Sequence, residues 1–143
     1  MDASFLMGDE LHRRGFGFDL ALASPAKRVV ETIAQFEKGF GGPLHPHFRE
    51  DIYAASAESL LKLLRATDDK VRRVLLVGHN PAQQELAFAL AAEKDPLRTD
   101  VAAHFPTAAA VLLELPVKRW EELQPGTGKI TAYLKPREIA KAR

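Results

Sequence analysis

The chain has 143 residues, no cysteine and a formal net charge of +1, with 46% hydrophobic and 27% charged residues. This length and composition fit one globular domain with a sizeable core. The lack of cysteine excludes disulfides, thiol catalysis and cysteine-based zinc sites, and the near-neutral charge gives no argument for nucleic acid or a membrane as partner. No apolar run approaches the roughly 20 residues of a membrane span, and the first residues lack a signal-peptide pattern. The sequence therefore predicts one cytoplasmic domain over residues 1–143.

The first third of the chain predicts two helices around a short strand. Apolar spacing indicates a helix over residues 3–14, and residues 19–23 form a short apolar run typical of a strand. Ser24 is then a suitable helix cap and Pro25 a suitable first helical residue, because proline lacks the N–H that this position leaves unbonded. We expect this second helix to continue until Gly39.

The middle of the chain carries its strongest local pattern. Residues 74–77 are a continuous hydrophobic run, typical of a strand buried on both faces of a parallel sheet. Asn80 then fits an N-cap and Pro81 the first position of the next helix. Before this run, residues 44–48 could form a short strand, and a leucine-rich helix begins near Ser56 without a full capping box.

The last third adds two more predicted strands, over residues 108–115 and 128–134. We expect residues 93–100 to form a charged loop and the residues from 135 onward to begin a basic tail. Strands that alternate with helices predict an α/β fold, specifically a three-layer α/β/α sandwich with a mostly parallel sheet.

His79 and Arg28 are the residues best placed for chemistry. His79 follows the buried strand and directly precedes a helix N-terminus, the edge where open α/β sheets bind ligands and where anions are favoured. Arg28 lies in the first turn of another predicted helix, where its guanidinium could bind two phosphate oxygens. Thr107, just before a further strand, could add a hydroxyl or a backbone N–H. The spacing leaves open a capping or packing role for His79 and a solvated helix face for Arg28.

The remaining histidines give weaker patterns. His45 and His47 would share one face of a strand, a spacing found in metal sites, but no third ligand is evident and exposed polar residues are the better interpretation. A metal-dependent hydrolase is therefore poorly supported. His12 fits an exposed helix surface, and His104 lies in a predicted loop. No glycine-rich nucleotide-binding motif is present.

Five segments, in order along nearly the whole chain, resemble one known family. Residues 24–32 resemble the Ser-Pro-x-x-Arg-x-x-x-Thr element of the histidine phosphatase superfamily, and residues 74–81 resemble its second histidine motif. Residues 52–56, 105–109 and 135–138 are similar to the small phosphohistidine phosphatase (SixA-like) branch. The resemblance implies a phosphoglycerate-mutase-like fold in a single histidine-phosphatase-like domain.

The resemblance also implies roles for particular residues. In this family a histidine in an Arg-His-Gly or Arg-His-Ala motif, at the end of the first strand, attacks phosphorus. A second histidine and two arginines stabilise the charge of the transferring phosphoryl group. By resemblance, His79 is the second histidine and Arg28 the second arginine, while Asn80 and Thr107 line the substrate pocket. No metal or organic cofactor is implied.

The chain departs from the family at the nucleophile. Its 143 residues contain no Arg-His-Gly or Arg-His-Ala motif, nor the strand that would carry it, and His12 does not match. We therefore expect the sequence to start late, with its first strand missing. A missing interior strand would leave backbone groups unpaired at about 1–3 kcal/mol each if buried, unless a partner chain or a sheet rearrangement closes the gap. Glu50 and Asp51 are nearby candidates for the general acid.

Two functions remain open from the sequence. The first is a phosphohistidine phosphatase-like phosphohydrolase, with a phosphate pocket at Arg28 and His79 and activity impaired by the absent nucleophile. The second is a non-catalytic phospho-ligand or protein-binding module on the same fold. Either function predicts a phosphorylated small molecule or a phosphohistidine protein as partner, and an exposed sheet edge would favour a homodimer.

Overall fold

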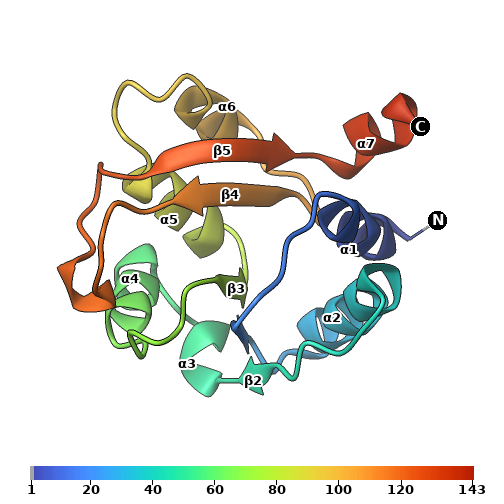
Figure 1. Cartoon of the computed structure of the whole chain (residues 1–143), viewed down its shortest axis with the longest axis horizontal. Coiled ribbons are helices and arrows are strands. Elements are labelled where there is room, and N and C mark those ends of the chain that lie inside the picture. The colour runs from blue at the N-terminus through green and yellow to red at the C-terminus, as the bar shows by residue number, and fades with distance from the viewer. Residues whose placement is uncertain (1) are drawn as a thin grey trace.

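A three-stranded parallel sheet lies at the centre of the computed structural model, which describes residues 2–143. Its strands follow the order β2-β1-β3 and comprise β1 (Leu20–Ala23), β2 (His47–Phe48) and β3 (Val74–Val77). The α/β fold with a parallel sheet predicted from the sequence is confirmed (Figure 1).

The two remaining strands form a separate antiparallel pair, β4 (Ala110–Glu114) and β5 (Lys129–Leu134). Within residues 2–143 no backbone ladder joins β3 to β4, although β4 is the strand of the pair nearer to β3 (Figure 1). Side chains of both strands nevertheless pack on one hydrophobic cluster, since Leu75 of β3 and Leu112 of β4 both contact it. The sheet is thus interrupted between these two strands, and the expectation of a missing interior strand stays a prediction.

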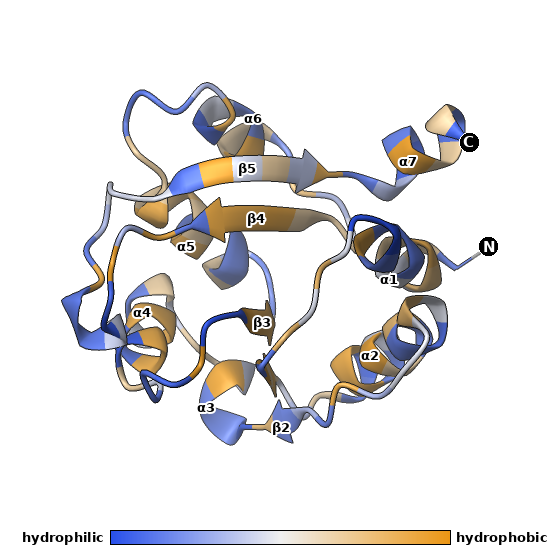
Figure 2. Cartoon of the chain, in the orientation of Figure 1, coloured by the Kyte–Doolittle hydropathy of each residue, from blue (hydrophilic) through white to orange (hydrophobic). Residues whose placement is uncertain are grey.

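The helices cover both faces of the strands (Figure 1). They are α1 (Ala3–Arg13), α2 (Lys27–Phe40), α3 (Glu50–Tyr53), α4 (Ala57–Arg65), α5 (Ala82–Leu90), α6 (Arg98–Ala103) and α7 (Pro136–Ala142), with one 3-10 turn, η1 (Trp120–Glu122). Neighbouring residues of β3 point to opposite sides, because Leu75 joins the cluster of α1 and α2 while Leu76 joins that of α4 and α5. Two separate apolar layers therefore sandwich the parallel sheet, and Figure 2 shows β3 in the hydrophobic colour.

Helices α1 and α2 approach each other through two glycines. A Cβ added to Gly8 would lie 2.1 Å from the carbonyl oxygen of Phe36, and one added to Gly39 would lie 1.9 Å from that of Phe5. Each glycine thus lies directly on the backbone of the other helix, a separation that no other residue permits. This contact fixes α2, whose first turn carries Arg28, against the rest of the domain.

Several predicted helix ends differ from the observed ones. Helix α2 begins at Lys27, not at Pro25, because the Ser24 hydroxyl bonds the N–H of Ala26 at 3.2 Å in a local turn instead of capping the helix. Helix α5 begins at Ala82, so Pro81 occupies the cap position predicted for Asn80.

Other local predictions were incomplete. The prediction that α4 begins without a full capping box is wrong: the Ser59 hydroxyl takes the place of the usual Glu or Gln side chain and accepts the N–H of Ser56 at 2.9 Å, while Ser56 accepts the N–H of Ser59 at 3.1 Å. The predicted charged loop over residues 93–100 contains the start of α6, and the predicted basic tail forms α7 with Pro136 in its first turn.

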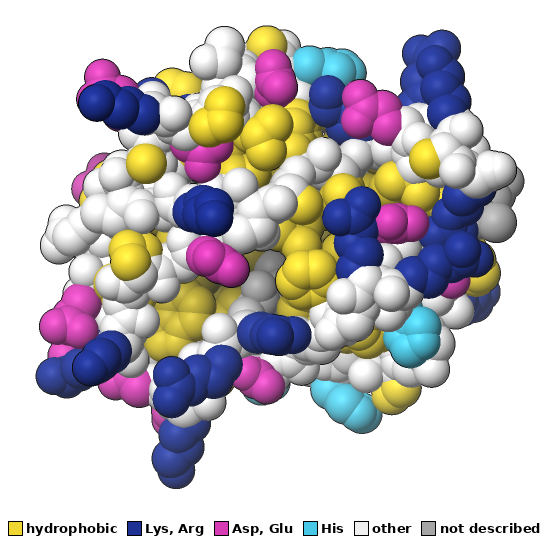
Figure 3. All heavy atoms as spheres, turned by 45° about the horizontal axis from the view of Figure 1, so that its top comes forward, with side chains coloured by type: hydrophobic (Ala, Val, Ile, Leu, Met, Phe, Trp, Pro, Cys, Tyr) yellow, Lys and Arg dark blue, Asp and Glu magenta, His cyan; other side chains and the backbone are white. Residues whose placement is uncertain are grey.

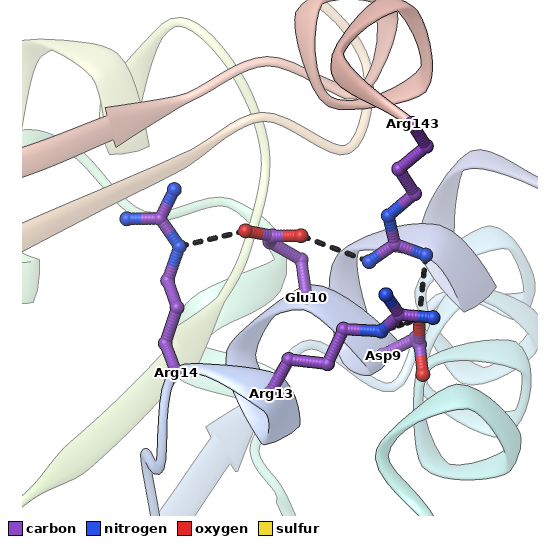
Figure 4. A network of polar contacts seen from close by, with 5 residues as sticks. All are labelled: Asp9, Glu10, Arg13, Arg14 and Arg143. Atoms are coloured by element: carbon purple, nitrogen blue, oxygen red, sulfur yellow. Dashed lines mark hydrogen bonds and ion pairs between the residues drawn. The ribbon is translucent and has the colours of Figure 1, made fainter.

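The C-terminal residue binds α1 through charged groups (Figure 4). Arg143 donates hydrogen bonds to Asp9 at 2.6 Å and to Glu10 at 2.8 Å, and these carboxylates also pair with Arg13 and Arg14 on their own helix. The Arg143 guanidinium is the main reason that the pKa of each carboxyl lies below its ordinary value. This network attaches the end of α7 to the second half of α1.

The surface mixes charges of both signs. On the face in Figure 3, lysines and arginines are interspersed with aspartates and glutamates, and apolar side chains are visible in its middle. Among the helices of residues 2–143, none has both the length and the apolar character that a membrane crossing needs.

Candidate functional site

The carboxyl ends of the three parallel strands meet at one edge of the sheet. The residues that directly follow them are Ser24 after β1, Arg49 after β2 and Gly78-His79 after β3. Ligands of open α/β sheets bind at this edge, because the loops there are free to carry side chains while the strands hold them in place.

The centre of this site is a contact between His79 and Ser24. Their side chains lie 2.7 Å apart, from Nε2 of the imidazole to Oγ of the hydroxyl. Ser24 is wholly buried, and its backbone N–H donates to the carbonyl of Val77 at 3.0 Å, which continues the β1–β3 ladder by one residue. Ser24, at the end of β1, therefore holds the imidazole of His79, which follows β3.

The turn after β3 holds His79 from its own side. Gly78 donates its N–H to the side-chain oxygen of Gln83, and the N–H of Gln83 donates to the carbonyl of His79 at 2.9 Å. The Tyr53 ring meets the imidazole edge-on, with 5.6 Å between ring centroids. With Ser24, these contacts fix the imidazole on several sides.

Arg28 lies at the same end of the sheet, in the first turn of α2. Its side chain is exposed, and within residues 2–143 it makes no hydrogen bond and no ion pair. The neighbouring Lys27 pairs loosely with Glu31 at 4.0 Å. The charge of Arg28 is therefore available at the N-terminus of a helix that begins just after Ser24, which is a suitable arrangement for an anion.

The loop before β4 reaches this edge through Asn80. Its side-chain N–H donates to the carbonyl of Phe105 at 3.4 Å, and the exposed Thr107 follows two residues later. The structure thus brings the region of Thr107 to the turn that holds His79. The binding roles of Arg28, His79, Asn80 and Thr107 stay predictions.

One of the two candidate acids is already paired. Arg49 donates two hydrogen bonds to the carboxylate of Asp51, at 2.9 and 2.7 Å, and these bonds hold the pKa of Asp51 below its ordinary value. A carboxyl with a lowered pKa is ionised near neutral pH, so Asp51 is poorly suited to donate a proton. Glu50, in the first turn of α3, stays a candidate.

The histidine pair considered for a metal does not form the predicted strand face. Strand β2 begins only at His47, and His45 has a left-handed backbone with φ of 51°. The strand expected over residues 44–48 is therefore shorter, because the chain turns at His45 before it enters the sheet. Both histidines are exposed, which confirms the preferred interpretation of them as exposed polar residues. In the part of the chain that the structure describes, no three or more metal-ligating side chains cluster together.

Comparison with solved structures identifies the fold. A proposed phosphohistidine phosphatase SixA from Agrobacterium tumefaciens superposes with a TM-score of 0.76 and 25% identity, over 94% of this chain and 78% of that one. The resemblance seen in the sequence is thereby confirmed. This chain has the fold of the SixA phosphohistidine phosphatases.

Two further SixA structures agree. One, from Nakamurella multipartitia, has a TM-score of 0.77 and 18% identity over 93% of this chain and 80% of that one. The other is the protein histidine phosphatase SixA complexed with tungstate, with a TM-score of 0.75 and 21% identity over 95% and 80% of the two chains. At these identities the two structures support the SixA fold alone.

Similarity at the sequence level is more distant. No protein-family model matches the chain. An uncharacterised protein of Mycobacterium leprae is 26% identical and aligns over 92% of this chain and 80% of its own length. Another uncharacterised protein, from Mycobacterium tuberculosis, is 28% identical, over 83% of this chain and 74% of its own length.

Two contacts in this SixA-like site were missed by the sequence analysis. Ser24 was read only as a helix cap, although a serine before a proline also fits a local turn in which the hydroxyl oxygen accepts a backbone N–H and its hydrogen is left for another partner. Tyr53 was noted only as part of a resembling segment. Neither contact has a local signal, because 55 residues separate Ser24 from His79 and the fold alone brings them together.

Proposed function

We propose that the chain binds a phosphoryl group at the edge formed by Ser24, Arg28 and His79, and that it is a phosphohistidine phosphatase-like phosphohydrolase. The observation that carries this proposal is that an unpaired guanidinium, Arg28, and a held imidazole, His79, lie at the same edge of the sheet on a SixA fold. The tungstate complex of one SixA neighbour supports it, because tungstate is a tetrahedral oxyanion like phosphate.

The two side chains offer complementary chemistry for this role. The guanidinium of Arg28 presents parallel N–H donors that match two phosphoryl oxygens, which gives both charge and geometry. The imidazole of His79 adds a further donor whose position is already fixed in the free protein. Phosphoryl transfer depends mainly on such positioning and charge stabilisation. The substrate class that we propose is a phosphohistidine protein or a phosphorylated small molecule.

A second candidate function is binding without turnover by the 143 residues of this sequence. The sequence lacks the Arg-His-Gly or Arg-His-Ala motif on which the family's covalent step depends. Ser24 does not replace the nucleophile, because its side chain is wholly buried and cannot reach a substrate. In this second function the chain is a phospho-ligand-binding module, which uses Arg28 and His79 as its anion site.

Both functions require that the chain binds an oxyanion at this site, and calorimetric titration with inorganic phosphate and tungstate tests that binding. We expect Arg28→Ala to weaken binding about tenfold or more, the range for a lost charge-assisted hydrogen bond. His79→Ala should weaken the binding as well. Lys27→Ala is the matched control, because Lys27 is the neighbouring exposed cation, and it should leave the binding nearly unchanged. Equal binding by wild type and Arg28→Ala would contradict the proposed site.

Turnover on an aryl phosphate and on a phosphohistidine peptide separates the two functions. Activity that His79→Ala abolishes supports the hydrolase. Binding of phosphate without turnover on either compound supports the binding module. Activity that survives both Arg28→Ala and His79→Ala places the chemistry elsewhere and refutes the proposal.

A further inference from the structure

We infer that Ser24 is a positioning residue that donates a hydrogen bond to Nε2 of His79 and thereby fixes the imidazole tautomer with its proton on Nδ1. The contact itself is the 2.7 Å distance between the two side chains. The inference about the tautomer stands on this geometry alone, whereas its use toward a phosphoryl group rests on the proposed function.

The direction of the hydrogen bond follows from what surrounds the Ser24 hydroxyl. A hydroxyl carries one hydrogen and can accept two hydrogen bonds. The backbone N–H of Ala26 already donates to this oxygen at 3.2 Å. Ser24 is wholly buried, so water does not reach it. Within residues 2–143 the only acceptor that contacts the hydroxyl is Nε2 of His79.

The opposite arrangement leaves a buried group without a partner. If Nε2 of His79 carried the proton, Ser24 would accept from both His79 and Ala26, and its own hydrogen would point at no acceptor. Buried polar hydrogens are almost always bonded, because an unbonded one loses its interaction with water without compensation. The hydroxyl hydrogen therefore goes to Nε2, and a neutral imidazole that accepts at Nε2 carries its proton at Nδ1.

This tautomer gives the site a defined donor. No protein group in the described part of the chain bonds Nδ1 of His79, so its N–H is free for a ligand. The carbonyl of His79 is held by Gln83, and the Tyr53 ring packs on the imidazole in a T-shaped arrangement. The imidazole thus cannot turn freely to exchange its two nitrogens. A phosphoryl oxygen bound at this edge of the sheet would meet an N–H donor that is already oriented.

Nitrogen-15 NMR of the imidazoles tests the inference directly, without any ligand. The measurement is made on the whole chain at alkaline pH, where the imidazole is neutral and its two nitrogens resonate differently according to which carries the proton. The spectrum of a His79→Gln variant identifies the His79 signals among those of five histidines. We expect wild-type His79 to be the Nδ1–H tautomer.

Three serine variants sharpen the test. Ser24→Ala should shift the tautomer ratio by about fivefold or more toward Nε2–H, the equilibrium value of one lost hydrogen bond. Ser24→Thr, which keeps the hydroxyl, should restore the wild-type ratio. Ser4→Ala is the matched control, because Ser4 is also buried but lies on α1, where its side chain bonds no histidine.

Each outcome decides the inference. A wild-type His79 in the Nε2–H form overturns it, and so does a Ser24→Ala protein whose tautomer ratio is unchanged. If Ser24→Ala does not fold, the wild-type spectrum still decides which nitrogen carries the proton. The proposed function fails separately, because a chain that does not bind phosphate can still show the Nδ1–H tautomer.

Discussion

Replacing Gly39 by alanine tests the close approach of α1 and α2. The new Cβ would lie 1.9 Å from the carbonyl oxygen of Phe5, more than an ångström inside the closest distance that real Cβ atoms show. The atom it meets belongs to a helix backbone, which cannot turn aside as the end of a flexible side chain can. The two helices must therefore separate, and the cluster between them loses contact.

The expected magnitude combines two opposing effects. Forcing an extra carbon into a packed interface costs about 1–3 kcal/mol and occasionally more. Alanine also favours the helix over glycine by about 1 kcal/mol. Because the contact is far too short and involves backbone on both sides, we expect the cost to dominate. With the cost at the upper end of its range, the net loss should be about 1–2 kcal/mol, or several degrees in melting temperature for a chain of this size.

Thermal and urea unfolding followed by circular dichroism measure this loss. Gly17→Ala is the matched control, because nothing lies within 4 Å of a Cβ at Gly17 and its φ is outside the left-handed region. It should be neutral or slightly stabilising. If Gly39→Ala melts together with Gly17→Ala, the helices are not in backbone contact and the reasoning is refuted.

Three further predictions concern stability. Asp19 accepts hydrogen bonds from the backbone N–H groups of Arg72 and Arg73, and these bonds hold its pKa below 3.8. Its contribution to the free energy of unfolding is therefore present above that pH and is lost as the pH falls through the lowered pKa. Asp19→Ala should therefore destabilise at neutral pH and converge with wild type in acid denaturation curves. Arg143→Gln should lower the melting temperature by an amount that shrinks at high salt, unless its carboxylate contacts are absent in solution. Leu123→Ala should cost about 2–5 kcal/mol in urea unfolding, since Leu123 is wholly buried; a smaller loss would show that the cavity collapses.

The sequence was informative where a local pattern decides the structure. Residues 74–77 are apolar without interruption, and the strand predicted there is observed as β3. The prediction that both of its faces are buried is wrong: its four residues are only partly buried, because within residues 2–143 no strand pairs with its outer edge. His79 was expected directly after that strand because Gly78 and Pro81 mark the two ends of the turn that contains it. The fold class followed from the alternation of strands and helices, which depends on nothing distant in the chain.

The sequence failed where competing interactions decide. Ser24 has the chemistry of a helix cap, but in the fold its hydroxyl bonds the Ala26 N–H and faces His79, and α2 starts later. Asp51 was a candidate general acid from the sequence, but in the fold its carboxylate is paired with Arg49. The separation of β4 and β5 from the parallel strands is also a property of the whole chain, since hydrogen-bonding partners between strands have no local pattern.

The interruption of the sheet beside β3 determines how firmly the turn with His79 is supported. Ser24 donates to the carbonyl of Val77, so alternate residues of β3 face β1, while the amides of Val74 and Leu76 turn toward the interruption. Native-state hydrogen exchange should therefore alternate along this strand, with Val74 and Leu76 exchanging faster than Leu75 and Val77. The imidazole thus follows a strand that, in the described part of the chain, is hydrogen-bonded to a neighbour along one edge only. Local opening of β3 would therefore disturb the position of the His79 N–H donor.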